Sequence, residues 1–273
     1  MKKWSIFLVF ILVILLISIK AYLDTTEFKV NRVQFHSDKL PENVEFTVLQ
    51  ISDLHNKVFG HDNQELIETV NQSNADIVVM TGDIIDRKTD DFQDVFTLVE
   101  GITDSGQDVF FVTGNHEQDH DNMEEFLDGL RERNVTVLDN RNTQVRVEGV
   151  TVNLAGVADS STDHEDIERA FAGLQPESYT ILLSHSPGIM GKYRNIPADL
   201  ILSGHTHGGQ VRLPFIGPIV APEQGLFPEF DQGVFETGRN QYLYIDSGLG
   251  TSVAPIRFLN KSQLSLITIT GSD

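Results

Sequence analysis

Five short apolar runs, each followed at once by a polar turn, constrain the fold of this 273-residue chain more than any other feature. The runs carry apolar side chains on both faces, which is typical of strands that are covered on both sides of a sheet. They are Phe46–Ile51, Asp76–Met80, Val109–Val112, Tyr179–Leu183 and Leu200–Leu202. We therefore expect a sheet whose strands lie in the interior of the molecule.

Amphipathic stretches lie between these runs. Apolar residues at helical spacing predict helices at Asp62–Ser73 and Asp121–Arg133. Weaker periodicity predicts two more at Asp90–Glu100 and Asp163–Leu174. Asp62 is the expected N-cap of the first helix. Further strands are predicted at Val150–Leu154, Gln210–Leu213, Tyr242–Ile245 and Gln263–Thr270. The segment Pro214–Gly238, which is rich in proline, glycine and phenylalanine, predicts a long loop near the site. Strands alternating with helices indicate an α/β layered domain.

The composition excludes several classes of protein. With 40 acidic against 20 basic side chains, the formal net charge of -20 argues against a nucleic-acid partner bound through its phosphates. The absence of cysteine excludes disulfides, thiolate zinc sites and cysteine nucleophiles. A hydrophobic content of 40% excludes a disordered chain.

The N-terminal segment predicts a membrane anchor. Trp4–Ile19 contains no charge and would span roughly 24 Å as a helix, and the residues that follow extend it to the length of a membrane span. Two lysines precede the run, as in both signal peptides and signal anchors. Because Ile19-Lys20-Ala21 is a poor cleavage site, an uncleaved anchor is favoured over a removed signal.

The chain divides on this basis into three parts. We expect residues 1–23 to be a single-pass anchor in the cell membrane, 24–44 a linker and first strand, and 45–273 one catalytic domain. Lysines on both sides of the apolar run leave the orientation undefined by charge. A short tail before a large domain favours an extracytoplasmic catalytic domain, and we expect a monomer.

Side chains that bind metals follow the apolar runs directly. They are Asp53, His55, Asp83, Asn115, His116, His185, His205 and His207. Because sites in open α/β sheets form at the carboxyl ends of strands, these residues are expected to converge at one edge. Imidazole, carboxylate and amide oxygen make a mixed site suited to manganese, iron or zinc. The candidate ligands exceed the needs of one ion, so two ions that share a bridging carboxylate are expected.

Each motif has a structural alternative when it is taken alone. A strand-end aspartate such as Asp53 commonly caps the next helix. The segments Gly82–Asp86 and Gly114–Glu117 each fit an ordinary turn. The two histidines in Gly204–His207 favour metal binding more strongly, because side chains two residues apart in a loop can reach neighbouring ions. The occurrence of all of these motifs together, in this order and at strand ends, carries the prediction.

The motif series resembles the calcineurin-like metallophosphoesterase superfamily. The resemblance covers residues 46–210 and rests on Asp53-x-His55, Gly82-Asp83-x-x-Asp86, Gly114-Asn115-His116-Glu117, His185 and Gly204-His205-x-His207. Ser203–Gln210, Leu213-Pro214 and Gly248–Ser252 are similar to the bacterial membrane-anchored branch of YkuE- and YaeI-like phosphodiesterases. The fold class implied is α/β (α+β), a four-layer β-sandwich flanked by helices and preceded here by a transmembrane helix.

The resemblance also implies a role for each motif residue. The first metal would be held by Asp53, His55 and His207. The second would be held by Asn115, His185 and His205, with Asp83 bridging the two ions. His116 would face the leaving group as the catalytic acid rather than bind metal. Asp86 would support a ligand from behind or cap a helix, and Glu117 would orient His116 or shape the turn.

The function implied is hydrolysis of a phosphate ester with two divalent ions, manganese, iron or zinc. A hydroxide that bridges the ions would attack a phosphodiester or pyrophosphate bond while His116 protonates the leaving alkoxide. Some relatives hydrolyse UDP-2,3-diacylglucosamine, and the anchor and phenylalanine-rich loop favour a lipid-linked or nucleotide-sugar substrate. The alternatives are a tethered, broad-specificity phosphomonoesterase or phosphodiesterase and a non-catalytic metal-binding scaffold.

Other charged residues are expected to lie on the surface. This group comprises His36, His61, His120 and His164. Arg87 could contact phosphate or form a surface ion pair.

Overall fold

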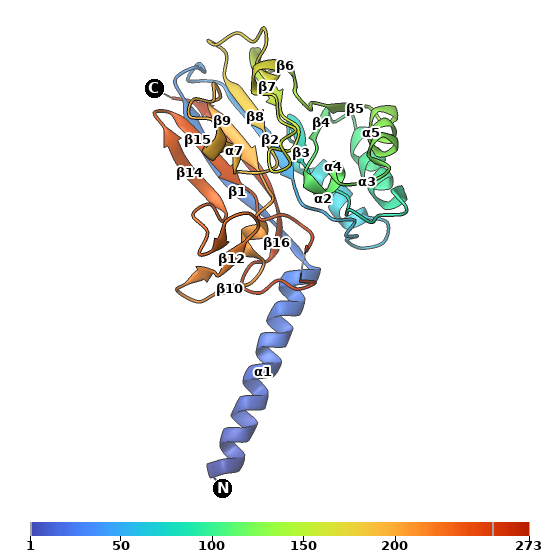
Figure 1. Cartoon of the computed structure of the whole chain (residues 1–273), viewed down its shortest axis with the longest axis vertical. Helices are drawn as coiled ribbons and strands as arrows, with labels where there is room; N and C mark the ends of the chain where they lie inside the picture. The colour runs from blue at the N-terminus through green and yellow to red at the C-terminus, as the bar shows by residue number, and fades with distance from the viewer. Residues whose placement is uncertain (1, 253, 273) are drawn as a thin grey trace.

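Two six-stranded sheets packed face to face contain the predicted apolar runs (Figure 1). The computed structural model describes residues 2–252 and 254–272. The first sheet has the order β1 (Phe28–Ser37), β16 (Ser262–Gly271), β2 (Glu45–Ile51), β3 (Ile77–Thr81), β4 (Val109–Val112) and β5 (Val135–Val137). The second has the order β14 (Gly233–Gly238), β15 (Gln241–Ile245), β9 (Leu200–Ser203), β8 (Thr180–Leu183), β7 (Val150–Gly156) and β6 (Arg141–Val147). Both sheets are mixed.

The centre of each sheet is parallel. Strands β2 to β5 run in one direction, and β16 is antiparallel to β2. Strand β1 is parallel to β16, so β1 begins at the end of the sheet where β2 finishes. In the second sheet β7, β8, β9 and β15 are parallel, and the two edge strands are antiparallel to their neighbours. The carboxyl ends of the central strands therefore meet at one end of each sheet.

Alternation along each strand explains why the runs are apolar at every position. On β2, Val48 faces the second sheet, whereas Leu49 and Ile51 face the helices on the outer surface. Side chains from both sheets, such as Val48 and Ile181, form the core between them. Successive residues of a strand point to opposite faces, so a strand buried on both faces needs apolar residues throughout.

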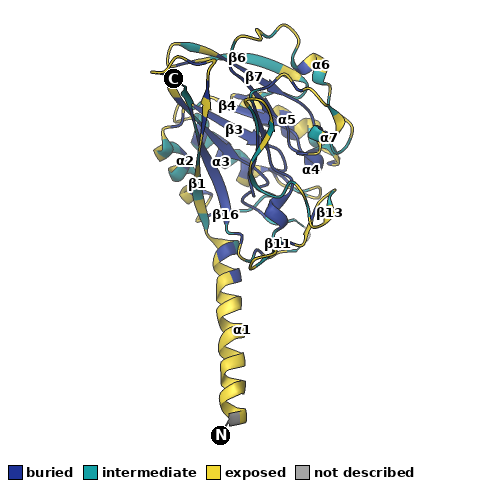
Figure 2. Cartoon of the chain, turned by 90° about the vertical axis from the view of Figure 1, so that its left-hand side faces the viewer, coloured by how far each residue is buried: buried dark blue, intermediate teal, exposed yellow. Residues whose placement is uncertain are grey.

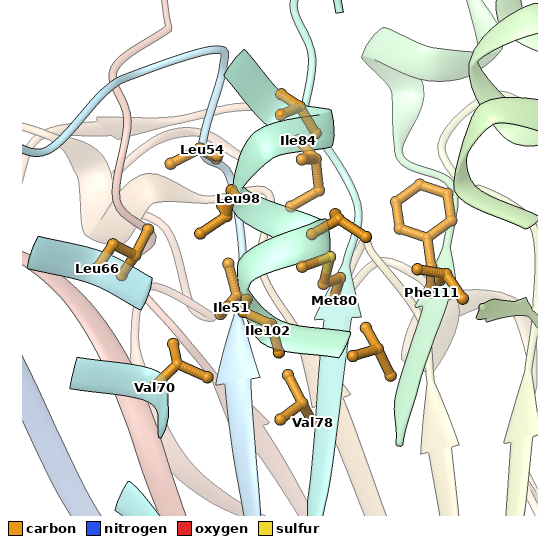
Figure 3. Packing of buried hydrophobic residues seen from close by; sticks show 14 of the residues in the cluster. Ile51, Leu54, Leu66, Val70, Val78, Met80, Ile84, Leu98, Ile102 and Phe111 are labelled. Atoms are coloured by element: carbon orange, nitrogen blue, oxygen red, sulfur yellow. The ribbon is translucent and has the colours of Figure 1, made fainter. Parts of the chain in front are cut away.

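Helices cover the outer face of each sheet. The first sheet is covered by α2 (Gln64–Ser73), α3 (Gln93–Thr103) and α5 (Met123–Glu132), and the second by α6 (Ile167–Ala170) and α7 (Ile189–Lys192). Figure 3 shows Leu66 of α2 and Leu98 and Ile102 of α3 packed over Ile51 and Met80 of the sheet. The arrangement gives four layers, helix, sheet, sheet and helix, and confirms the predicted fold class.

The structure corrects the expected limits of two helices. Helix α2 begins at Gln64, and its N-cap position is occupied by Asn63 rather than Asp62. The side chain of Asn63 accepts a hydrogen bond from Phe59 N at 3.0 Å, which fixes the entry of the chain into the helix. The helix expected over Asp163–Leu174 is shortened to α6, which begins after the capping residue Asp166, whose side chain accepts from Arg169 N, and ends at Ala170.

The segment Pro214–Gly238 is not one long loop. It forms most of two small hairpins, β10 (Arg212–Leu213) with β11 (Gly217–Pro218) and β12 (Val220–Ala221) with β13 (Gly225–Leu226), and then edge strand β14. Strand β10 falls within the predicted strand Gln210–Leu213. The other three strands were not predicted, because strands of two residues are too short to show an alternating pattern.

An N-terminal helix, α1 (Lys2–Thr26), projects from the domain (Figures 1 and 2). Residues Lys3–Thr26 are long and apolar enough to cross a membrane, by length and composition alone, and a signal sequence would have the same properties. The last two turns pack into the domain, where Ala21 and Asp24 are buried. Glu27 alone separates α1 from β1, so the helix joins the first sheet without a flexible linker.

Candidate metal centre

The strand ends of both sheets bring the predicted site residues together. Asp53 and His55 follow β2, Asp83 follows β3, Asn115 and His116 open the short helix α4 (Asn115–Gln118) after β4, His185 follows β8, and His205 and His207 follow β9. All of these residues except His55 are buried, and the His55 side chain is only 2% exposed. Residues more than 150 positions apart in the sequence thus share one site.

The first group of candidate ligands consists of Asp53, His55 and His207. One ligand atom from each lies within 4.8 Å of the others. His55 Nε2 is 3.1 Å from His207 Nε2, and His207 Nε2 is 3.4 Å from Asp53 Oδ1. The two imidazole rings are stacked, with centroids 4.9 Å apart. The three side chains therefore bring two ring nitrogens and one carboxylate oxygen together at one place, where they could bind the same ion.

The second group consists of Asp83, His185 and His205. His185 Nε2 is 3.2 Å from Asp83 Oδ2 and 3.1 Å from His205 Nδ1. Asp83 Oδ2 is also 3.7 Å from His55 Nε2 of the first group. One carboxylate oxygen therefore lies between the two groups, which is where a bridging ligand is needed.

His116 lies at the edge of the same cluster. Its Nε2 is 3.9 Å from Asp83 Oδ2, and its ring centroid is 4.4 Å from that of His55. One ligand atom from each of His55, Asp83 and His116 also lies within 4.8 Å of the others. His116 thus adjoins both groups of candidate ligands, and metal content in a His116 variant tests whether its imidazole binds metal.

The backbone of the centre is held in an uncommon conformation. Five candidate ligands that are not glycine have positive φ angles: Asp53, His55, Asp83, His205 and His207. Left-handed backbone at such residues costs of order 1–3 kcal/mol each and persists where the surrounding structure imposes it. Hydrogen bonds between the turns supply that constraint, including Asp53 N to Gly82 O and His55 N to Asp83 O, both 3.0 Å.

Glu117 fixes two of these turns from behind. It is fully buried, and its carboxylate accepts hydrogen bonds from the backbone N–H groups of Asp83, Ile84, Ile85 and Gly114 at 2.7–3.1 Å. Its side chain therefore positions Asp83 and the start of α4, a wider role than the turn or the His116 contact that the sequence predicts.

The remaining predicted residues have defined places. His185 Nδ1 donates to Thr81 O at 2.8 Å, which leaves Nε2 to face Asp83. Asp86 lies 3.8 Å from His55 Nδ1 and 3.6 Å from His116 Nδ1. Helix capping by Asp86 is excluded, because the next helix begins at Gln93.

Burial and charge set the protonation of the metal-free centre. Burial lowers the pKa of His55 to about 4 and that of His207 well below its usual value, so both rings are neutral. Burial also opposes the charged forms of His185 and Asp83. Their mutual attraction outweighs it, so the pKa of His185 is held well above and that of Asp83 well below the usual values. The pair is therefore an imidazolium beside a carboxylate.

The donor atoms of the centre fit divalent ions. One buried oxygen of a candidate ligand, Asn115 Oδ1, has no hydrogen-bond partner among the residues that the structure describes. Leaving buried polar atoms unpaired costs about 1–3 kcal/mol each. Nitrogen and oxygen donors of this kind suit manganese, iron or zinc.

Two residues at the centre were not predicted from the sequence. Glu223, between β12 and β13, places Oε2 3.5 Å from His205 Nε2 and accepts from Ser186 Oγ at 2.9 Å. Burial would raise the pKa of Glu223, but His205 and Ser186 lower it to about 2. Arg257 is fully buried and approaches His207 Nδ1 to 3.5 Å. Both residues are isolated in unpatterned loops, so no sequence signal marked them.

Two surface expectations have different outcomes. His120 is buried, with Nε2 2.9 Å from Thr89 O and its ring beside Phe92, so its expected exposure is wrong. Arg87 forms the expected ion pair, with Nε 2.8 Å from Asp119 Oδ2. Its Nη1 also lies 2.6 Å from His116 Nε2, which the sequence did not predict.

A four-layer sandwich that carries buried imidazole and carboxylate groups at one end of both sheets defines a metal-dependent hydrolase. The model of the family "Calcineurin-like phosphoesterase" matches residues 46–209, and the chain belongs to this family of phosphoester hydrolases.

Relatives along most of the chain carry the same family description. An uncharacterized metallophosphoesterase of Bacillus subtilis, YkuE, is 30% identical over 257 residues, which cover 92% of this chain and 87% of that protein. An uncharacterized metallophosphoesterase of Aquifex aeolicus is 30% identical over 264 residues, which cover 92% of this chain and 95% of that protein.

Solved structures share the fold at low identity. The Haemophilus influenzae NAD nucleotidase has a TM-score of 0.52 at 17% identity, and the match covers 76% of this chain but 46% of the nucleotidase. TT1561 of Thermus thermophilus has a TM-score of 0.52 at 11% identity, and the match covers 76% of this chain and 91% of TT1561.

Proposed function

We propose that the chain is a membrane-anchored phosphoesterase that uses two divalent ions to hydrolyse a phosphodiester or pyrophosphate bond. The observation that carries the proposal is the position of Asp83 Oδ2, 3.2 Å from His185 Nε2 and 3.7 Å from His55 Nε2. A single carboxylate between two ligand groups is what a pair of neighbouring ions requires.

The ligand sets follow from the two groups. Asp53, His55 and His207 would hold one ion, and His185 and His205 the other, with Asp83 shared. Asn115, whose buried Oδ1 has no hydrogen-bond partner among the described residues, would complete the second set. Manganese, iron and zinc all suit these donors. When bound, such ions polarise the phosphoryl oxygens and acidify water near neutral pH.

His116 is proposed as the proton donor to the leaving group. Water gives up a proton to the solvent, and the resulting hydroxide forms a bond to phosphorus as the bond to the leaving oxygen breaks. The leaving oxygen takes a proton from the His116 imidazolium, which becomes neutral and regains a proton from the solvent. Burial, with the Arg87 guanidinium, lowers the pKa of His116 in the metal-free protein despite Asp83 nearby. Because a guanidinium only donates, Arg87 must leave His116 Nε2 before that atom can serve the substrate, and it is then free to bind phosphate.

The proposed substrate is a lipid-linked or nucleotide-sugar phosphoester, such as a UDP-2,3-diacylglucosamine-like molecule. Support comes from α1, which would hold the domain at the cell membrane on its extracytoplasmic side, and from exposed apolar residues near the centre. A broad-specificity envelope phosphatase and a metal-binding scaffold without activity are the alternatives.

The test is hydrolysis of bis-p-nitrophenyl phosphate and p-nitrophenyl phosphate by purified full-length protein with added manganese. We expect diester hydrolysis, lost on chelation and restored by the metal. His116→Ala should lower turnover by roughly 10²–10⁴-fold with metal content unchanged. The control, His164→Ala, removes an exposed histidine outside the centre.

Each contrary outcome has one meaning. Loss of metal from His116→Ala would make His116 a ligand. Bound metal with no hydrolysis of either ester would favour the scaffold.

A further inference from the structure

The two hairpins β10–β11 and β12–β13 expose a cluster of apolar side chains. We call it the hairpin face, and it consists of Phe215, Ile216, Val220, Leu226 and Phe227. Phe215 is fully exposed, and Leu226 and Phe227 are 69% and 68% exposed. Large apolar residues gathered in so short a segment are characteristic of a surface that contacts another apolar phase.

Hydrogen bonds place the hairpin face beside the end of α1. Arg257 N donates to Thr25 Oγ1 in the last turn of α1 at 2.8 Å. The next residue, Phe258, exchanges backbone hydrogen bonds with the start of the first hairpin, since Arg212 N donates to Phe258 O at 2.9 Å. Figures 1 and 2 both show the hairpins at the end of the domain from which α1 leaves. The face is therefore continuous with the proposed membrane span.

The same hairpins border the metal centre. Strand β12 packs against the 3-10 turn His207–Gly209, which contains a candidate ligand. Between β12 and β13, Glu223 brings its carboxylate within 3.5 Å of His205 Nε2. One pair of short hairpins thus reaches the centre on one side and carries the exposed apolar residues on the other.

The sheet topology accounts for this placement. Strand β1 begins directly after α1 and pairs Phe28 with Ser262. On the other side of β16, Gln50 near the end of β2 pairs with Ser265. The end of β2, which leads to Asp53, therefore lies at the end of the sheet where α1 enters. A helix that crosses the membrane would hold the metal centre at the bilayer surface.

We propose that the hairpin face inserts into the interfacial layer of the lipid bilayer beside α1, so that the metal centre opens at the level of the lipid headgroups. The inference deepens the proposed function and rests on α1 as a membrane span. Charge does not supply the contact, because the chain carries a net charge of -20 and two of the cations near the face are paired. Arg212 pairs with Asp231, and Lys261 pairs with Glu27. Apolar insertion that is insensitive to salt is the expected mode.

The absence of cysteine makes a direct test simple. Single variants Phe227→Cys and Phe215→Cys of the full chain would be labelled with an environment-sensitive fluorophore in phosphatidylcholine nanodiscs. We expect the emission of both labels to be blue-shifted in nanodiscs relative to lipid-free detergent. We also expect lipids with a nitroxide near the headgroup to quench both labels several-fold more strongly than a label at a control position. The control is Arg239→Cys, which is exposed in the β14–β15 turn. Its neighbour Asn240 contacts Asp38, beyond the distal end of β1.

The outcomes separate this inference from the proposed function. Labels at 215 and 227 that are quenched no more than the label at 239 would overturn the inference. So would a blue shift without lipid quenching, because it would mean that the face packs against a second copy of the chain. The same preparations would be assayed on bis-p-nitrophenyl phosphate, whose hydrolysis depends on the metal centre and not on lipid contact. Hydrolysis without quenching refutes only the membrane surface, and quenching without hydrolysis refutes only the activity.

Discussion

At the scale of single residues, the side chains behind the ligands control the geometry of the centre. Glu117 binds no metal in the proposed scheme, yet its two carboxylate oxygens accept from four backbone N–H groups of two turns. Burial and the nearby Asp83 raise the pKa of Glu117 to about 7. The hydrogen bonds favour its charged form and partly offset this effect.

Replacing Glu117 by glutamine tests that support. The amide would direct an NH₂ group at two backbone donors, so we expect a loss of about 2–4 kcal/mol in the free energy of unfolding. Manganese affinity should fall as well, because Asp83 loses its fixed position. Denaturant unfolding and metal titration measure both effects. Glu68→Gln, on the exposed side of α2, should change neither, and a Glu117 variant as stable as this control would contradict the role.

The pairing of His185 with Asp83 predicts how metal binding depends on pH. The pKa of His185 lies well above its usual 6.5 in the metal-free protein, so its ring carries a proton at neutral pH. An ion that uses His185 Nε2 must displace this proton, and we expect release of about one proton at neutral pH for the ion that His185 holds. The apparent affinity should therefore fall as the pH is lowered. Calorimetric titration in two buffers of different ionisation enthalpy measures the proton, and identical enthalpies would contradict the ligand role.

The same pair has a linked effect on stability. A histidine whose pKa is raised on folding contributes stability that is complete below its unfolded pKa, near 6.5, and is lost as the pH rises through the folded value. In the metal-free protein the stability contributed by His185 should therefore decrease as the pH rises above neutral. Bound metal should remove this dependence of stability on pH.

At the scale of secondary structure, the sequence predicted the elements that are buried on both faces. The central strands of both sheets coincide with the apolar runs of the sequence, because a strand covered on both faces must be apolar throughout. Edge strand β6 was not predicted, since its exposed polar residues, such as Arg141 and Arg146, break the pattern. In the hairpins over 212–226 only the first strand, within the predicted Gln210–Leu213, was expected, because two-residue strands are too short to show an alternating pattern.

The convergence of the candidate ligands was predictable for a related reason. Side chains that follow strand ends meet at one edge whatever the loop lengths, so the positions of Asp53, Asp83 and His185 in the sequence predicted that they lie together. Glu223 and Arg257 reach the centre from loops whose paths depend on tertiary packing. Their contribution therefore appears only in the folded structure.

Two turns approach so closely that only glycine fits between them. Gly82 has a φ of +80°, and a Cβ there would lie 2.5 Å from Gly114 N and 2.8 Å from His185 Nδ1. Gly106 has a similar φ of +88°, but a Cβ there would meet nothing within 4 Å. Comparing substitutions at the two positions therefore distinguishes the cost of a left-handed backbone, which both share, from the cost of crowding, which only Gly82 has.

Alanine at each position should give different results. Gly106→Ala is expected to cost about 1–2 kcal/mol from the left-handed conformation. Gly82→Ala should add about 1–3 kcal/mol from crowding and should also weaken metal binding, because the turns after β3 and β4 must separate. Thermal unfolding with and without manganese measures both. Equal losses in the two variants, with metal affinity intact, would show that the close approach is unimportant.

At the scale of the whole molecule, α1 is a packed part of the domain as well as a candidate anchor. Its last two turns bury Ala21 and Asp24, and Lys57 Nζ donates to Thr25 O. Arg257 joins this turn to the centre, because its backbone binds Thr25 while its guanidinium approaches His207. Cleavage of a signal peptide close to these residues would remove contacts of the folded domain, which supports retention of the helix.

Two neighbouring threonines in α1 allow this connection to be tested in the full chain. Thr25 Oγ1 donates to Ala21 O and accepts from Arg257 N, whereas Thr26 Oγ1 donates only to Tyr22 O on the exposed side. Thr25→Val should leave a largely buried N–H unpaired and lower the free energy of unfolding by about 1–3 kcal/mol, while Thr26→Val should be close to neutral. Because Arg257 also lies beside His207, we expect the Thr25 variant, and not the Thr26 variant, to bind manganese more weakly. Thermal unfolding and metal titration in detergent measure both effects, and two equally stable variants would mean that α1 is a tether attached to an independent domain.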